Sequence, residues 1–434
     1  MKILIVHALE DVESARRTVL NQSFFLLKYA PHHDYTLQCL RHPLSEETVN
    51  KDYDIIVIDC TILCYRWASP SSFLQNLKEK YDFIRRSSAK KIAFPQDDYD
   101  HYAILDQWMV DWKVDVIFSP LAEYADELYP QSSRKAAILP CLTGYVDSAD
   151  IAIIERHAQQ PMAERRIDVG YRARRLPYKF GRFGLLKSDI ADRFTAAVQK
   201  SGATLALDIS TRPEATILGT NWLKFLGNCR FVLGTASGSS LLDPDGRVQN
   251  AILAYQAVHP NADFDEVEMN CFPGLEGRRL YATLGPRILE AAAVRACQIL
   301  VPNDGLKPLL PDVHYIPLDP FCKNIDEVLS KMADLDRAKA MADATYDLLI
   351  SSNDYKYESL TKNLFCAVGK ESEYILCIAD PIDSLIADCN ILQRLYKHQI
   401  QWMQNHEPMR RPLYKAFLFC QKVLDWASAR IFRG

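Results

Sequence analysis

The sequence predicts an α/β fold of two doubly wound domains that face each other across a cleft, followed by a helical C-terminal extension. Two observations predict it. Short apolar runs bounded by turn residues are typical of buried parallel strands. Stretches long enough for crossover helices separate these runs, which is the spacing of a βαβ chain. This alternation occupies the first 150 residues and starts again after residue 165.

The first predicted domain covers residues 1–150. Turn residues such as Pro95, Pro120 and Pro140 close several of its apolar runs, as expected where a buried strand ends. The expected strands are 3–8, 54–59, 91–94, 114–118 and 136–139, and the expected helices are 11–29, 71–87 and 101–112.

The second predicted domain covers residues 165–370, after a junction that contains Pro140, Gly144 and Pro161. Beyond it we expect a helical return segment, 371–407, and a basic amphipathic tail, 408–434. The expected strands of this domain are 167–171, 203–209, 230–233, 296–301 and 315–318, and its helices are 187–200, 287–295 and 324–333.

Composition excludes several classes of protein. The 434 residues are 48% hydrophobic and 24% charged, which is typical of a folded domain and not of a disordered chain. With 55 acids against 51 bases, the net charge of −4 argues against a nucleic-acid partner. No run reaches the ~18 apolar residues that span a bilayer. The start is too short for a signal peptide and the 12 cysteines include no CxxC pair, so we expect a cytoplasmic protein with reduced thiols.

Basic residues follow the first strand of the second domain. Tyr171 ends it, Arg172 and Arg174 come directly after it, and Lys187 stands where the next helix is expected to begin. Cations at a strand end beside a helix N-terminus suit a diphosphate. A solvated basic loop at a domain boundary is the equally favoured alternative.

A run of small residues follows the strand at 230–233. Ser237 and Gly238 would let the backbone approach a ligand closely. Asp243 and Asp245 come next and could in principle bind a metal ion. Two carboxylates on a glycine-containing loop are more often a turn, so we predict no metal site.

A helix is expected to open with Pro286 in its first turn. Arg287 and Glu290 are three residues apart and therefore share one face of this helix. Glu290 could accept hydrogen bonds from a ribose diol. From these residues alone, a local ion pair at the helix start is the favoured interpretation.

Acidic residues and a histidine follow the strand at 91–94. Asp97, Asp98 and His101 could supply a general base or contacts to sugar hydroxyls. A cluster that caps the next helix is an equally good interpretation, because Asp is a favoured N-cap residue.

The order of these segments resembles the glycosyltransferases of GT-B architecture, and within them the bacterial group-one, CgeB-like transferases. The likeness spans about residues 90–346, and no P-loop, GxSxG or HExxH motif competes with it. The segments that carry it are 94–99, 142–146, 167–172, 285–293, 298–301, 311–318 and 324–328.

The resemblance implies two Rossmann-like domains and a metal-independent hexosyltransferase with no cofactor, whose donor is a nucleotide sugar. It implies that Glu290 holds the ribose and that Arg172 or Arg174 and Lys187 hold the diphosphate. Many relatives carry a second glutamate eight residues earlier, where this chain has Ala282. The residues expected at the donor are Tyr171, Arg172, Arg174, Lys187, Ser237, Gly238, Pro286, Arg287 and Glu290, and those expected to be catalytic are Asp97, Asp98 and His101.

The expected acceptor is a glycan or a lipid-linked glycan in bacterial surface polysaccharide synthesis. Residues 410–434 carry six bases and one acid, with apolar residues at helical spacing. This pattern favours binding to an anionic membrane surface, on the inner face of the cytoplasmic membrane, over docking on the protein's own core. Two other functions stay open: a nucleotide-sugar epimerase of the same architecture, and a non-catalytic carbohydrate-binding or assembly protein.

Overall fold

The computed structural model describes residues 1–9, 15–68, 72–157 and 160–375. The predicted tail 408–434 and most of the return segment 371–407 lie outside the described residues. None of the described helices is both long and apolar enough to cross a bilayer.

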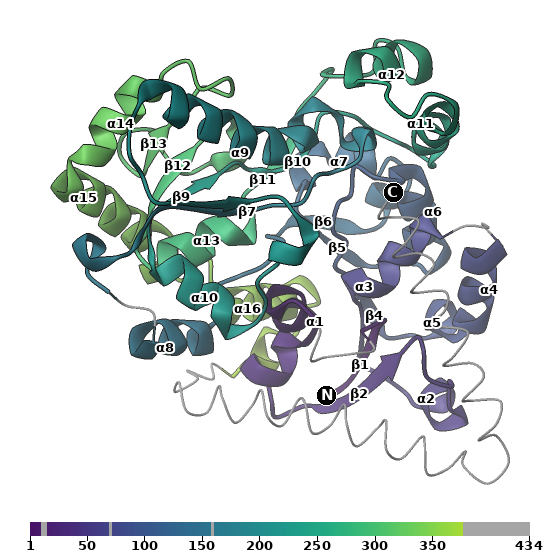
Figure 1. The fold of residues 1–434 in the computed structure, drawn as a ribbon. Helices are drawn as coiled ribbons and strands as arrows, with labels where there is room; N and C mark the ends of the chain where they lie inside the picture. Colours follow the sequence, from purple (N-terminus) through teal and green to yellow (C-terminus); the bar gives the residue numbers. More distant parts are fainter. Residues whose placement is uncertain (10–14, 69–71, 158–159, 376–434) are drawn as a thin grey trace, which may run out of the picture. The chain divides into compact units, whose positions relative to one another are not determined.

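The first domain is built on one six-stranded sheet in which every neighbouring pair is parallel (Figure 1). All five strands expected in this half are present. The sequence did not predict β2. This strand contains polar residues and lacks the apolar run by which the other strands were predicted. The order across the sheet is β2 (Asp34–Cys39), β1 (Lys2–His7), β3 (Ile55–Ile58), β4 (Lys90–Ala93), β5 (Val116–Ser119) and β6 (Ala137–Pro140).

Helices cover this sheet and bury its apolar side chains. Ile58 and Ile117 of the strands share one core with Trp108 and with Trp112. Burying side chains of this size is the main contribution to the stability of the domain. The helices are α1 (Arg17–Tyr29), α2 (Glu46–Asn50), α3 (Cys60–Leu63), α4 (Ser72–Lys80), α5 (Asp82–Arg86), α6 (Tyr102–Asp111) and α7 (Ala125–Leu128).

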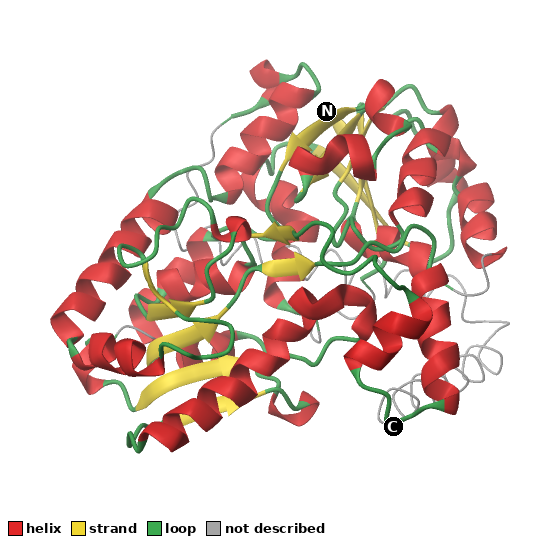
Figure 2. Cartoon of the chain, turned by 90° about the horizontal axis from the view of Figure 1, so that it is seen from above, coloured by secondary structure: helices red, strands yellow, loops and turns green. Residues whose placement is uncertain are grey.

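The second domain has its own five-stranded parallel sheet, and Figure 2 shows it apart from the first, with helices alongside. The predicted α/β fold with two doubly wound domains is therefore confirmed. The strand order is β13 (Tyr315–Pro317), β12 (Cys297–Leu300), β9 (Cys229–Gly234), β7 (Ile167–Arg172) and β8 (Leu207–Ser210). The helices are α8 (Ser148–His157), α9 (Gly181–Ser201), α10 (Thr220–Gly227), α13 (Pro286–Ala293), α14 (Ile325–Ala333) and α15 (Leu335–Tyr346).

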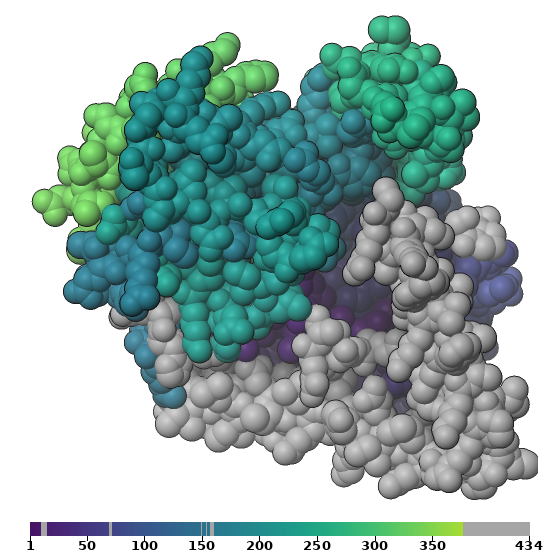
Figure 3. Space-filling model, in the orientation of Figure 1, coloured from purple at the N-terminus to yellow at the C-terminus, as the bar shows by residue number. Residues whose placement is uncertain are grey.

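An insertion that the sequence did not predict interrupts the second domain. β10 (Ser237–Ser239) pairs antiparallel with β11 (Tyr281–Thr283), and α11 (Arg247–Val258) and α12 (Phe264–Cys271) lie between them in the chain. These two helices share a small core of their own and stand out as a green lobe in Figure 3.

The last described helix, α16 (Tyr357–Ala367), returns to the first domain. The ring of Tyr357 stacks on Phe25 of α1, with 5.8 Å between ring centroids. The end of the range expected for the second domain, 165–370, thus packs against the first.

Each sheet has one point where the chain changes direction across it. In the first sheet this point lies between β1 and β3, and in the second it lies between β7 and β9. Ligands of open parallel sheets bind beyond the carboxyl ends of the strands at such points.

Candidate active site

A cavity of about 320 Å³ lies between the two domains, at these points of both sheets. The ends of β7 and β9 and the start of α13 line it from the second domain. The start of α1 and Gln96, Asp97 and Thr143 line it from the first. The topology of the two sheets therefore brings residues from distant parts of the chain to one site.

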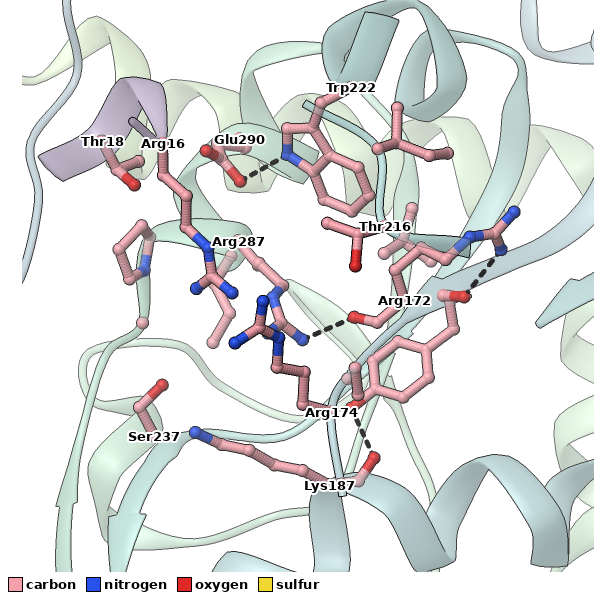
Figure 4. Close-up of a pocket in the computed structure, with 18 of the residues that line it drawn as sticks. Arg16, Thr18, Arg172, Arg174, Lys187, Thr216, Trp222, Ser237, Arg287 and Glu290 are labelled. Carbon is pink, nitrogen blue, oxygen red and sulfur yellow. Dashed lines mark hydrogen bonds between the residues drawn. The ribbon is translucent and has the colours of Figure 1, made fainter. Parts of the chain in front are cut away.

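Three arginines point toward one another across the cavity. Arg16, at the start of α1, faces Arg174 and Arg287 of the second domain (Figure 4). One nitrogen of Arg287 donates to the main-chain carbonyl oxygen of Arg172 at 2.7 Å, which fixes its direction. Burial lowers the pKa of Arg16, and the like charges of Arg174 and Arg287 lower it further. Such a cluster is complementary to an anion with more than one charge.

Lys187 adds a fourth cation and points toward Ser237 on β10 (Figure 4). Burial lowers its pKa to about 8, and the charge of Arg287 contributes to the same effect. The expected helix start at Lys187 is wrong, because α9 begins at Gly181. Gly181 has a φ of 66°, and a Cβ there would lie 2.4 Å from Oγ of Ser240, so the helix starts where a residue without a side chain is required.

Glu290 lies on α13 and is held by a tryptophan. Its Oε2 accepts a hydrogen bond of 2.8 Å from Nε1 of Trp222. Burial raises the pKa of Glu290, while the Trp222 hydrogen bond and the charges of Arg287 and Arg16 oppose the rise. Because Arg287 donates to a carbonyl and Glu290 accepts from Trp222, the local ion pair between them is not what organises this helix start.

Arg172 lines the cavity, but its side chain is bound within the second domain. Its guanidinium points away from the centre of the cavity and forms an ion pair with Asp208 at 2.7 Å (Figure 4). It also lies 4.5 Å from the ring of Phe225 and donates to three carbonyl oxygens. The Arg172 side chain is thus bound within the second domain. Its main-chain carbonyl oxygen contributes to the site by accepting the hydrogen bond from Arg287.

The other residues expected at the donor site are Tyr171, Gly238, Ser237 and Pro286, and they have different places in the structure. Tyr171 is buried, and its hydroxyl donates to the carbonyl oxygen of Lys187 at 2.9 Å, which ties β7 to α9. Gly238 does not line the cavity. It lies against β11, where a Cβ would come within 1.9 Å of the carbonyl oxygen of Tyr281. A glycine is therefore needed at this position for β10 to pair with β11. Ser237 and Pro286 do line the cavity, as expected.

Of the three residues expected to be catalytic, Asp97 alone lines the cavity. Its φ is 53°, and its Oδ1 accepts a hydrogen bond of 2.6 Å from the hydroxyl of Tyr99. Asp98 is 1% exposed, and its Oδ2 accepts from Ser119 and Tyr129 inside the first domain. A carboxylate enclosed in this way is not available to a substrate in the cavity.

His101 is also used elsewhere. Its Nδ1 lies 2.8 Å from Oδ1 of Asp100, and its main-chain N–H donates to the carbonyl oxygen of Asp243 at 2.6 Å. The residue belongs to a contact between the two domains, outside the cavity lining.

Among the described residues, one group could in principle hold a metal ion: Asp100, His101 and Asp243. Its donor atoms have protein partners. Nζ of Lys179 lies 2.7 Å from Asp100, and Asp243 accepts main-chain N–H groups from Gly246 and Gln249. A lysine ammonium already supplies the positive charge here.

Sequence reasoning missed several lining residues, among them Arg16, Thr18, Thr216 and Trp222. Arg16 follows the first strand and precedes a helix with no acid in its first turn, and this pattern could have marked it. Trp222 has no such signal, because only the fold places α10 beside α13, and Thr216, in the loop before α10, has none either.

No protein-family model matches the chain, and no curated protein matches it in sequence. Similar solved structures include an α-glucosyltransferase in complex with UDP and a 13-mer DNA containing a HMU base (12% identity, 85% of this chain and 100% of that chain, TM-score 0.48). HepE of Anabaena in complex with UDP-glucose is 10% identical over 85% of this chain and 99% of that one, with a TM-score of 0.47.

AviGT4, a glycosyltransferase involved in avilamycin A biosynthesis, is 12% identical over 85% of this chain and 97% of that chain, with a TM-score of 0.43. The similar structures are GT-B glycosyltransferases, as the resemblance predicted. The narrower CgeB-like likeness is not confirmed. Because these TM-scores are below 0.5, what the chain does is inferred from its own cavity.

Proposed function

We propose that the protein is a glycosyltransferase that moves a sugar from a nucleoside-diphosphate donor to an acceptor hydroxyl. The observation that carries the proposal is the placement of Glu290 beside a cluster of cations in one interdomain cavity. A carboxylate held by Trp222 can accept hydrogen bonds from a ribose diol. Arg174, Arg287 and Lys187 line the same cavity and match the charge of an attached diphosphate.

The cations match the charge that develops during transfer. The acceptor oxygen forms a bond to the anomeric carbon as the bond from that carbon to the phosphate oxygen breaks. The electron pair of the broken bond goes to the nucleoside diphosphate. Arg174, Lys187, Arg287 and the start of α13 would stabilise this charge. We propose that these groups, and no metal ion, neutralise the leaving group.

Asp97 is the carboxylate that the first domain contributes to the cavity. We propose that it accepts the proton of the acceptor hydroxyl, as a general base must. We further propose a glycan or lipid-linked acceptor, and a membrane surface as the partner of residues 408–434. These two proposals rest on the resemblance and on the charge of the tail.

A binding experiment tests the donor site. A thermal-shift screen with nucleoside diphosphates identifies the base, because a ligand raises the apparent stability of the protein that binds it. Calorimetry with that ligand then compares the wild type with Glu290→Ala and Lys187→Ala. We expect each variant to lose about tenfold in affinity, as for one charge-assisted hydrogen bond.

Exposed Lys135, outside the cavity lining, provides the control variant Lys135→Ala, for which we expect wild-type affinity. Unchanged affinity in both site variants would contradict the proposal. Incubation with the nucleotide sugar alone separates the epimerase alternative, since an epimerase forms its product without an acceptor.

A further inference from the structure

The starts of two helices, one from each domain, meet at the cavity. The first residues of α1 and of α13 both line it. Gly144 lies between them: a Cβ at this position would be 3.2 Å from Cγ of Pro286 and 3.9 Å from Cβ of Thr18. The two helix starts are therefore separated by little more than one main-chain segment.

Both helix starts carry positive side chains where negative ones are usual. Neither α1 nor α13 has an acid in its first turn, and neither has a side-chain cap. The N-terminus of a helix bears a partial positive charge, so an arginine there is unfavourable without an anion. Arg17 has such an anion in Asp150, with which it forms an ion pair. Arg16 instead points toward Arg174 and Arg287 (Figure 4).

The first domain thus adds the Arg16 guanidinium and the N-terminus of α1 to the cations that the second domain places at the cavity. We propose that Arg16 and the N-terminus of α1 bind the diphosphate of the donor, so that both domains hold this group. This inference rests on the proposed function. It extends the donor site across the cleft and makes Arg16 a ligand-binding residue.

Burial lowers the pKa of Arg16, and the like charges of Arg174 and Arg287 on the cavity side lower it further, in agreement with this arrangement. Glu290 has the opposite effect on that pKa, yet it already accepts from Trp222. An anion with two or more charges would relieve the repulsion among the three guanidiniums. It would also connect α1 to α13 through one ligand.

Inorganic pyrophosphate and matched nucleotides test the inference. Calorimetry compares the wild type, Arg16→Ala and Arg16→Lys for binding of pyrophosphate, the preferred nucleoside diphosphate and its parent nucleoside. For Arg16→Ala we expect about tenfold weaker binding of both phosphates, as for loss of one charge-assisted contact, and unchanged binding of the nucleoside. Arg16→Lys should recover part of the loss. Lys135→Ala, on the surface of the same domain, is the control.

Thermal melting without ligand separates binding from folding. Because Arg16 lies among like charges, Arg16→Ala should melt no lower than the wild type. If the wild type binds no nucleoside diphosphate, the proposed function fails. If the wild type binds and Arg16→Ala binds equally well, or loses the nucleoside to the same degree, this inference alone is overturned.

Discussion

The Nζ atom of Lys179 lies 2.7 Å from Oδ2 of Asp100, and this ion pair connects the second domain to the first. The other carboxylate oxygen of Asp100 is 2.8 Å from Nδ1 of His101, and Lys179 also donates to Gln249. The two side chains are 13% and 4% exposed. A buried pair with these additional hydrogen bonds is costly to break by removing one partner.

Asp100→Ala is therefore expected to destabilise the protein. It leaves the ammonium of Lys179 buried without its carboxylate, which costs about 3 kcal/mol in comparable pairs. Urea denaturation followed by circular dichroism measures the change in midpoint. Lys339→Ala is the control, because this lysine pairs with Asp343 on the surface and is 68% exposed. Equal midpoints for the two variants would show that the Asp100 pair adds no stability.

The contribution of Asp100 to the free energy of unfolding should decrease as the pH falls. Burial acts to raise the pKa of Asp100, but the hydrogen bond to His101 and the charge of Lys179 outweigh it and lower the pKa. A lowered carboxyl pKa stabilises the folded state above the ordinary value of about 4. The stability difference between the wild type and Asp100→Asn should be complete at neutral pH and decrease as the pH falls below about 4. A difference independent of pH would contradict this assignment.

Lys187 should make nucleotide binding sensitive to alkaline pH. Burial and the charge of Arg287 lower its pKa to about 8, so the free protein loses this cation as the pH rises above that value. A bound diphosphate favours the protonated lysine. We therefore expect the affinity for a nucleoside diphosphate to fall about tenfold between pH 7.5 and pH 9.5, with proton uptake on binding.

Calorimetry in buffers of different ionisation enthalpy measures that proton uptake. Lys187→Arg is the matched variant, because an arginine stays charged across this range. Its affinity should change little with pH. If the wild type and Lys187→Arg have the same pH profile, Lys187 is not the titrating group.

The fold was largely predictable because buried parallel strands have a strong pattern. The apolar runs of both sheets stand out between turn residues, and ten of the observed strands coincide with them. β2 was missed because it is an edge strand with polar residues. β10 and β11 were missed because each has three residues and their pairing crosses a long insertion.

Site residues could be predicted where the end of a strand fixes the position of a side chain. They were harder to predict where contacts with distant parts of the chain determine where the side chain points. Asp97, Arg174 and Glu290 reach the cavity from predicted elements. The direction of the Arg172 guanidinium could not be predicted, because its partner Asp208 is 36 positions later in the chain. The burial of Asp98 could not be predicted either, because Ser119 and Tyr129, which donate to it, are 21 and 31 positions later in the chain. The local sequence around Arg172 or Asp98 does not reveal these hydrogen-bond partners.

Gly144→Val should weaken donor binding by separating the two helix starts. A valine Cβ would be 3.2 Å from Cγ of Pro286 and 3.9 Å from Cβ of Thr18, and its two methyl groups would need further space. Forced overpacking costs about 1–3 kcal/mol, part of which would appear as displacement of α1 from α13. We expect nucleoside diphosphate affinity to fall about tenfold, as for a loss near 1.4 kcal/mol. Gly144→Ala, which needs a shift of the neighbours alone, should have a smaller effect, and equal effects would contradict the steric argument.

Trp222→Phe tests whether the indole N–H sets the state of Glu290. The substitution keeps an aromatic ring on α10 but removes the hydrogen bond of 2.8 Å to Oε2. That hydrogen bond opposes the rise that burial causes in the pKa of Glu290, so its loss should raise this pKa further. A protonated Glu290 is a poorer acceptor for ribose hydroxyls. Nucleoside diphosphate affinity should therefore fall about tenfold at neutral pH, as for one hydrogen bond to a charged group, and fall more at pH 5.5. Calorimetry at both pH values measures the effect, and pyrophosphate, which has no ribose, should bind the variant and the wild type equally.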